Sequence, residues 1–157
     1  MSVTNSERLA ALGLVLPPVP TPAAAYVPAV RYGDLVIVSG QLPLVDGTLV
    51  ATGLVGDGPV EHDVRAAAEL ARRCALNVLA AAAAVAGGLD ALASVLRVGV
   101  FVASAGGFTQ QHLVADGASE LMGAVLGPEA VHARAAVGVA RLPLDAPVEV
   151  EAMLTVG

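Results

Sequence analysis

Hydrophobic and polar residues alternate strictly in two segments towards the end of the chain. In Arg134–Leu142 the larger apolar side chains Val137 and Val139 fall on odd positions, and Arg134, Ala136, Gly138 and Ala140 on even ones. In Val148–Val156 the phase is reversed, with apolar residues on even positions and Glu149 and Glu151 on odd ones. A period of two is typical of half-buried strands. The connecting LPLDAP segment supplies turn residues, so the pattern predicts that the two strands pair as a hairpin.

The register of this hairpin has a consequence for two charged residues. If the apolar positions of both strands face one core, Arg134 and Glu149 share the opposite face. The other first-strand residues on that face, Ala136, Gly138 and Ala140, are too small to cover a sheet alone. We therefore expect a cleft or a subunit interface there.

The rest of the pattern predicts short strands and long helices. A short helix is expected at Ser6–Ala11, followed by a proline-rich arm within residues 1–25. Strands are expected at Val27–Arg31, Leu35–Gly40, Gln41–Leu44, Thr48–Val50 and Val95–Ala103. Long helices are expected from Pro59 to Ala86 and from Thr109 to Leu126. This order predicts a single α+β domain over residues 1–157, with its helices on one face of a sheet and the other face open.

Composition adds an expectation about assembly. Of the 157 residues, 56% are hydrophobic and 14% are charged, which is unusually apolar for a monomer and suggests burial between subunits. A net charge of −6 argues against a nucleic-acid partner. The longest apolar run, residues 74–86, is shorter than the roughly 20 residues of a membrane span. Without a signal peptide pattern, we expect a cytoplasmic protein that does not enter membranes.

Several reactive residue types have structural explanations. Cys74 lies among apolar residues and is expected in the core. The three histidines, His62, His112 and His132, lack the spacing of metal ligands, so no metal site is expected. Ser39 is expected to form a hydrogen bond at a strand end, because no histidine pairs with it in an evident way.

Two motifs resemble those of the RidA/YjgF proteins. Leu35–Pro43, with the sequence LVIVSGQLP, resembles their SGQ strand and turn, and Tyr26 stands where their tyrosine precedes it. Ala133-Arg134 together with Val148–Ala152 is similar to their C-terminal signature. The resemblance runs from about Tyr26 to Val156, so the chain is identified as a member of this family.

The resemblance implies a chorismate-mutase-like fold, in which a mixed sheet carries two main helices on one face. It also implies a homotrimer with a central barrel and clefts between the subunits. The implied activity is hydrolysis of reactive enamine or imine intermediates, released by pyridoxal-phosphate enzymes, to 2-keto acids and ammonia. The partner is then a small metabolite that carries a carboxylate, and no cofactor is required.

The resemblance also assigns roles to residues. Arg134 would grip the carboxylate of the substrate, since a guanidinium binds a carboxylate through two parallel hydrogen bonds. Glu149 would position a water molecule and move protons. Backbone groups at Ser39 and Gly40 would hold the substrate, because glycine permits close approach, and Tyr26 would form a wall of the cleft.

Departures from the family pattern leave alternatives open. Asp116 aligns with an asparagine of the deaminase-type members, Ala136 replaces a common cysteine, and His132 replaces a proline. Ala136 and Asp116 are expected at the substrate site, where Asp116 would put a second carboxylate near a negatively charged substrate and weaken its binding. A non-catalytic or differently specific trimer that binds metabolites is therefore the second interpretation, and a ribonuclease is the least favoured. Arg134 could also serve only as a structural ion pair with a glutamate.

Overall fold

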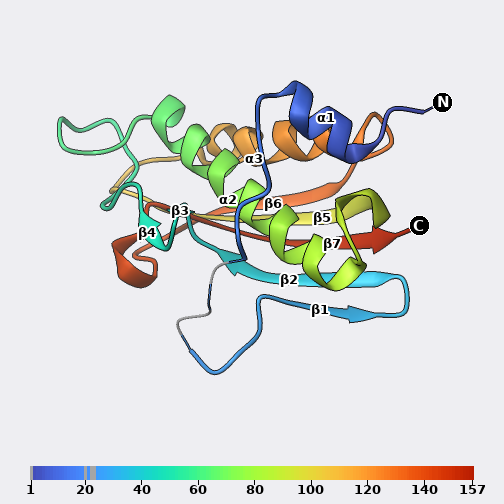
Figure 1. Ribbon diagram of the computed structural model, residues 1–157. Helices are drawn as coiled ribbons and strands as arrows, with labels where there is room; N and C mark the ends of the chain where they lie inside the picture. The colour runs from blue at the N-terminus through green and yellow to red at the C-terminus, as the bar shows by residue number, and fades with distance from the viewer. Residues whose placement is uncertain (1, 20, 22–23) are drawn as a thin grey trace.

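The computed structural model describes residues 2–19, 21 and 24–157, and it places a layer of helices on one face of a sheet (Figure 1). In spatial order the strands are β1 (Ala29–Tyr32), β2 (Leu35–Gln41), β7 (Val148–Val156), β5 (Leu92–Ala103) and β6 (Ala133–Val139). Helices α2 (Val64–Ala86) and α3 (Gln111–Leu126) cover the sheet, and the short α1 (Asn5–Ala11) contacts α3. The predicted α+β architecture, with helices on one face, is confirmed.

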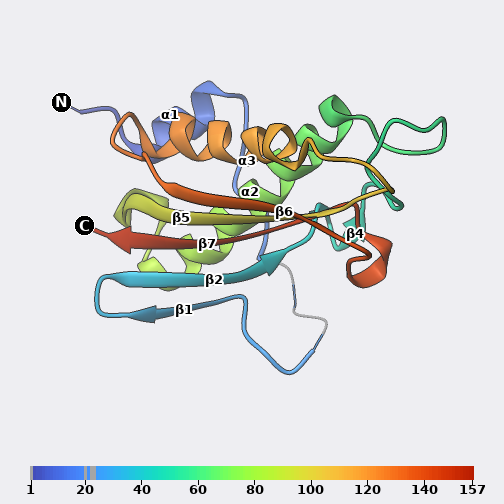
Figure 2. The ribbon, with the colours of Figure 1, turned by 180° about the vertical axis from the view of Figure 1, so that it is seen from behind.

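The predicted hairpin of the last two strands is wrong. β5 lies between β6 and β7, antiparallel to β7 and parallel to β6 (Figure 2). The reason is that β5, α3 and β6 form a β-α-β unit, and a helical crossover makes its two strands parallel neighbours. The connector after β6 then steps over β5, through a 3₁₀ turn at Pro143–Asp145, to reach β7.

This strand order changes the faces on which the two charged residues lie. Arg134 on β6 stands opposite Val98 of β5, which is fully buried beneath the helices. Glu149 on β7 stands opposite Phe101 of β5, three residues further along and therefore on the other face. The prediction that Arg134 and Glu149 share a face is wrong within one chain.

Capping residues explain where the helices begin and end. Thr4 and Glu7 form a capping box at α1, whose predicted position is confirmed. The Asp63 side chain accepts a backbone hydrogen bond at the start of α2, and Gly87 ends this helix with a φ of 99°. The start predicted at Pro59 is too early, because Asp63 supplies the cap and the residues before it form a loop.

The core lies between the sheet and α2, whose alanine-rich surface packs closely. Cys74 is fully buried there, as predicted, and its Sγ donates a hydrogen bond to the Val148 carbonyl at 3.6 Å. Burial raises the pKa of the Cys74 thiol well above its usual value, which disfavours the reactive thiolate. None of the helices within the described ranges is long and apolar enough to cross a membrane.

The predicted hairpin around Asp46-Gly47 is present but shorter than expected. It consists of β3 (Leu44–Val45) and β4 (Thr48–Leu49), outside the main sheet. The N-terminal arm passes α2 on its way to β1 (Figure 1). The arm positions Met1, Pro20, Pro22 and Ala23 lie outside the described residues.

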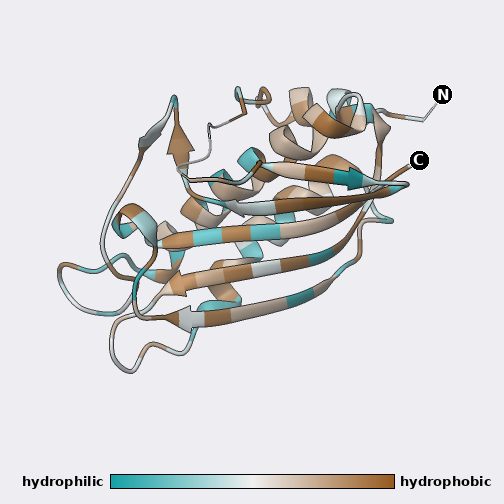
Figure 3. Cartoon of the chain, turned by 90° about the horizontal axis from the view of Figure 1, so that it is seen from below, coloured by the Kyte–Doolittle hydropathy of each residue, from teal (hydrophilic) through white to brown (hydrophobic). Residues whose placement is uncertain are grey.

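The sheet face opposite the helices is open, and Figure 3 looks onto it. Val30, Ile37 and Val137 on this side are 48%, 42% and 46% exposed. Arg97 and Glu151 form an ion pair of 3.1 Å there. A sheet face with this many uncovered apolar side chains is typical of a surface that contacts another protein.

Candidate functional site

Arg134 is held against α3 by three polar groups. Its Nη1 donates to Asp116 Oδ1 at 2.8 Å and to Ser119 Oγ at 3.1 Å, and its Nη2 donates to the His112 carbonyl oxygen at 3.0 Å. The three partners lie on one face of the helix, because they are four and three residues apart. The side chain of Arg134 is only 24% exposed, so its guanidinium is fixed in position.

The contacts of Arg134 leave one edge of its guanidinium available. Within the described part of the chain, Nε and the second hydrogen of Nη2 have no acceptor. These two groups form a planar fork that fits a carboxylate. A bound carboxylate could therefore take this edge while Asp116 keeps its own bond to Nη1.

Ser119 and His132 extend the group of polar residues around Arg134. His132 places Nε2 at 2.8 Å from Ser119 Oγ and Nδ1 at 3.1 Å from the Ala130 carbonyl oxygen. A carbonyl only accepts, so we assign the proton to Nδ1, and Nε2 then accepts the Ser119 hydroxyl proton. Ser119 thereby bridges His132 and Arg134. This pair was not predicted from the sequence, where its only signal was the histidine two residues before Arg134.

A second group of candidate residues lies on β2 and β7. The register between these strands shifts between Val38 and Gln41, so that Ser39 and Gly40 form a bulge opposite β7. A Cβ atom at Gly40 would collide with the Glu149 carboxylate, so the absent side chain lets this carboxylate lie over the backbone of β2. Gly40 and Glu149 are therefore neighbours, as expected for parts of one site.

Ser39 and Tyr26 join the second group. Ser39 Oγ donates to the Val27 carbonyl at 2.7 Å, which agrees with its predicted role as a strand-end hydrogen bonder. Tyr26 directly precedes Val27 in the chain and is 49% exposed. Ser39, Gly40 and Glu149 thus form the second group, and Tyr26 is connected to it through its chain neighbour Val27.

The small residues of β6 do not form the predicted open cleft. Ala136 faces the helix layer with Arg134 and packs against the core. A Cβ atom at Gly138 would lie 2.8 Å from Gln111 Nε2 and 2.9 Å from Ser104 Oγ. Side chains of the same chain therefore approach Ala136 and Gly138, which corrects the expectation of an open cleft within one chain, and the alternative of a subunit interface stays a prediction.

The surroundings of Glu149 suit a proton-transfer group. Burial raises the pKa of its carboxyl above the ordinary value of 4.5, and the nearby Glu151 carboxylate raises it further. A general acid–base group works best when its pKa approaches the working pH. The raised pKa of Glu149 therefore makes this carboxyl the candidate for proton transfer in the second group.

Replacing Glu149 by glutamine is expected to change how stability depends on pH. A carboxyl with a raised folded-state pKa stabilises the fold fully below about pH 4.5, and this contribution is lost as the pH rises through the raised value. Glu149→Gln should therefore become more stable relative to the wild type as the pH rises above 4.5. Thermal unfolding at several pH values measures this difference. Glu120→Gln, on the exposed side of α3, is the control, and an equal response of both variants would contradict the assignment.

The group around Arg134, which includes Asp116, Ser119 and His132, cannot meet the second group within one chain. They lie on opposite faces of the sheet, and β5 separates β6 from β7. Neighbouring strands are about 4.8 Å apart, so β6 and β7 lie about 10 Å apart with β5 between them. The opposite faces increase the separation of the two groups further.

Among the described residues, no group of three histidine, cysteine or acidic side chains could hold a metal ion.

Comparison with known proteins gives consistent matches. The family model described as Endoribonuclease L-PSP matches residues 18–156. Protein TCP17 of Trypanosoma cruzi is 45% identical over 159 residues, with 98% of each chain covered. The crystal structure of Agrobacterium tumefaciens protein Atu1372, of unknown function, matches with a TM-score of 0.84 and 42% identity, over 98% of this chain and 92% of that one. The YjgF gene product of Escherichia coli matches with a TM-score of 0.61 and 26% identity, over 89% and 93% of the two chains.

Proposed function

Because the chain belongs to the Endoribonuclease L-PSP family, which is the RidA/YjgF family, we propose that it hydrolyses reactive enamine or imine intermediates to 2-keto acids and ammonia. The observation that carries the proposal is the fixed guanidinium of Arg134 with a carboxylate-binding edge still available. A 2-imino acid carries a carboxylate next to its C=N bond. Binding at Arg134 therefore holds the reactive carbon at a defined distance from the protein.

Glu149 supplies the proton transfers in this proposal. Its carboxylate takes a proton from a water molecule while the water oxygen bonds to the imine carbon, and it then passes this proton to the imine nitrogen. The resulting carbinolamine loses its hydroxyl proton to Glu149, and Glu149 gives this proton to the nitrogen as the C–N bond breaks and ammonia leaves. The products are a 2-keto acid and ammonia, and the carboxylate is regenerated.

We further propose that the complete site forms between copies of the chain, in a chorismate-mutase-like homotrimer with a central barrel. Arg134 and Glu149 lie on opposite faces, so one substrate can touch both only if another chain brings its Glu149 to the Arg134 region. Two features support this assembly. The open sheet face is apolar, and β6 has a free hydrogen-bonding edge at the end of the sheet.

The test is the release of ammonia and keto acid from a freshly generated 2-imino acid. We expect the folded wild-type protein to accelerate both above the spontaneous rate in buffer, in equal amounts. A well-folded oligomer that accelerates neither product contradicts the proposed reaction.

A further inference from the structure

His132 lies next to Arg134, and the proposed reaction gives it no role. It is partly buried in the segment that leads into β6, two residues before Arg134. Its Nδ1 lies 3.1 Å from the Ala130 carbonyl oxygen, and its Nε2 lies 2.8 Å from Ser119 Oγ on α3. The imidazole ring is therefore held between its own segment and the helix.

The Ser119 hydroxyl has to present a lone pair to Arg134. A hydroxyl group rotates, and it carries one hydrogen and two lone pairs. Arg134 Nη1, which lies 3.1 Å from Ser119 Oγ, can only donate, so the hydroxyl hydrogen must point away from it. The hydrogen points instead to Nε2 of His132, which can only accept because the ring proton is on Nδ1. His132 therefore sets the direction of the Ser119 hydroxyl.

The direction of this hydroxyl matters for the orientation of the guanidinium. Arg134 Nη1 has two hydrogens, and Ser119 Oγ and Asp116 Oδ1 accept one each. Without its acceptor, a serine hydroxyl within a helix can turn toward the carbonyl four residues earlier. Nε and Nη2 lie in the same plane as Nη1, so holding Nη1 in place also holds the edge that fits a carboxylate.

We propose that His132 is a positioning residue, which acts through Ser119 to hold the carboxylate-binding edge of Arg134 in place. The inference rests on the proposed function, because that function makes a carboxylate the ligand of this edge. Removing the imidazole lets the Ser119 hydroxyl rotate, and Arg134 then loses a fixed acceptor. Carboxylate binding becomes weaker, whereas the proton transfers at Glu149 do not change.

The experiment is calorimetric titration of pyruvate, a stable 2-keto acid, into the full chain in its assembled form. Pyruvate carries the carboxylate that Arg134 would bind, and its binding does not require the reaction. His132→Leu and Ser119→Ala should each weaken pyruvate binding about fivefold, the usual effect of losing one hydrogen bond. The double variant should bind as weakly as either single variant, because His132 acts only through Ser119. His132→Gln should regain much of the affinity, since its side-chain carbonyl can accept the hydroxyl proton.

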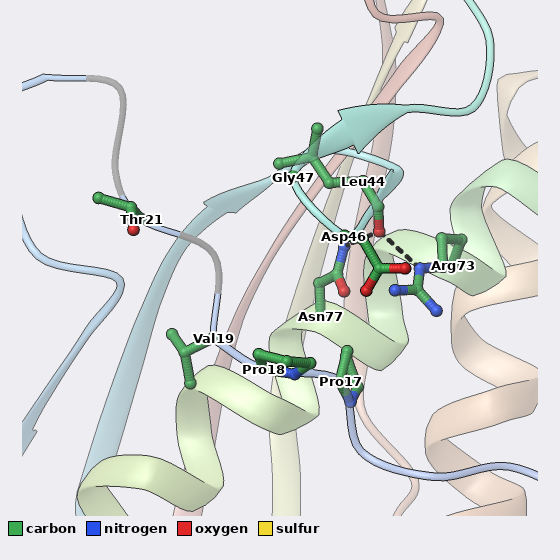
Figure 4. A pocket seen from close by; sticks show the side chains of 9 residues that line it. All are labelled: Pro17, Pro18, Val19, Thr21, Leu44, Asp46, Gly47, Arg73 and Asn77. Atoms are coloured by element: carbon green, nitrogen blue, oxygen red, sulfur yellow. Dashed lines mark hydrogen bonds between the residues drawn. The ribbon is translucent and has the colours of Figure 1, made fainter.

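Two control variants test for effects elsewhere on the chain. His62→Leu removes another imidazole that contacts a backbone carbonyl, that of Thr52 at 2.7 Å. Arg73→Gln changes an arginine that lines a separate cavity of about 240 Å³, formed by the N-terminal arm, α2 and the β3–β4 hairpin (Figure 4). Both variants should bind pyruvate as the wild type does, and thermal unfolding verifies that every variant is folded.

Two further readouts separate positioning from a purely structural role. In the deamination assay, His132→Leu should raise KM about fivefold and leave kcat unchanged. NMR of the ¹⁵N-labelled ring, at about pH 8.5 where a histidine is usually neutral, should show the His132 proton on Nδ1.

Four results would overturn the proposal: a proton on Nε2 of His132, unchanged affinity in His132→Leu, additive effects of His132→Leu and Ser119→Ala, or no pyruvate binding to the folded wild type. A wild type that binds pyruvate through Arg134 but releases no ammonia from a 2-imino acid would contradict the proposed function alone. In that case the pyruvate affinities still decide the role of His132.

Discussion

Replacing Arg134 by glutamine is expected to lower kcat/KM for a 2-imino acid by about a thousandfold. The guanidinium edge formed by Nε and Nη2 binds the carboxylate by two charge-assisted hydrogen bonds, and removing such a contact from a largely covered site costs about 4 kcal/mol. Steady-state rates of ammonia release measure the effect. Arg134→Lys should recover little, because an ammonium group cannot form the planar fork, and its three N–H groups cannot serve three contacts to α3 and a carboxylate together.

The fold should tolerate this change, so the loss can be read as a functional one. Asp116 is 47% exposed at its side chain and can be solvated when Arg134 is removed. Arg65→Gln is the matched control, since Arg65 is an exposed arginine in the first turn of α2, and it should retain full activity. Activity of Arg134→Gln within tenfold of the wild type would show that Arg134 is a structural residue.

Replacing Gly117 by alanine is expected to destabilise the fold by about 3 kcal/mol. Gly117 lies on α3 where this helix crosses α2, and a Cβ atom there would collide with the carbonyl oxygen of Ala68. That oxygen belongs to the backbone of α2, so the helices themselves must separate to make room. Chemical denaturation measures the change in the free energy of unfolding.

Gly123→Ala on the same helix is expected to stabilise the fold instead. A Cβ atom at Gly123 meets nothing within 4 Å. Alanine has the higher helix propensity, so this variant should gain about 0.5–1 kcal/mol. Equal stability of the two variants would contradict the close α2–α3 packing, because both remove a glycine from one helix and differ only in their surroundings.

Local pattern predicted the strands and helices of this chain, but it did not predict how the last strands pair. Residues 134–142 and 148–156 alternate clearly, and both are strands, although the first is shorter than its pattern suggested. Alternation defines two faces for each strand but does not identify which strand lies next to it. The β-α-β order of β5, α3 and β6 was the better guide, because a helical connection favours parallel neighbours.

The candidate site shows the same division between local and long-range information. The family motif identified Arg134, Glu149 and Gly40, and the contact of Gly40 with Glu149 follows from the bulge in β2. The position of Arg134 against α3 depends on strand order, which the motif does not contain. The hydrogen bond between Ser119 and His132 joins residues thirteen positions apart. It therefore became visible only once α3 and β6 were placed side by side.

The central claim is that each site takes Arg134 from one chain and Glu149 from another. Assemblies formed by refolding a 1:1 mixture of Arg134→Gln and Glu149→Gln chains test it most directly, with mass spectrometry to verify that the chains have mixed. Random pairing gives about a quarter of the sites both functional residues, so the mixture should recover about a quarter of wild-type activity although each parent is inactive. Verified mixed assemblies that remain as inactive as their parents would contradict the account.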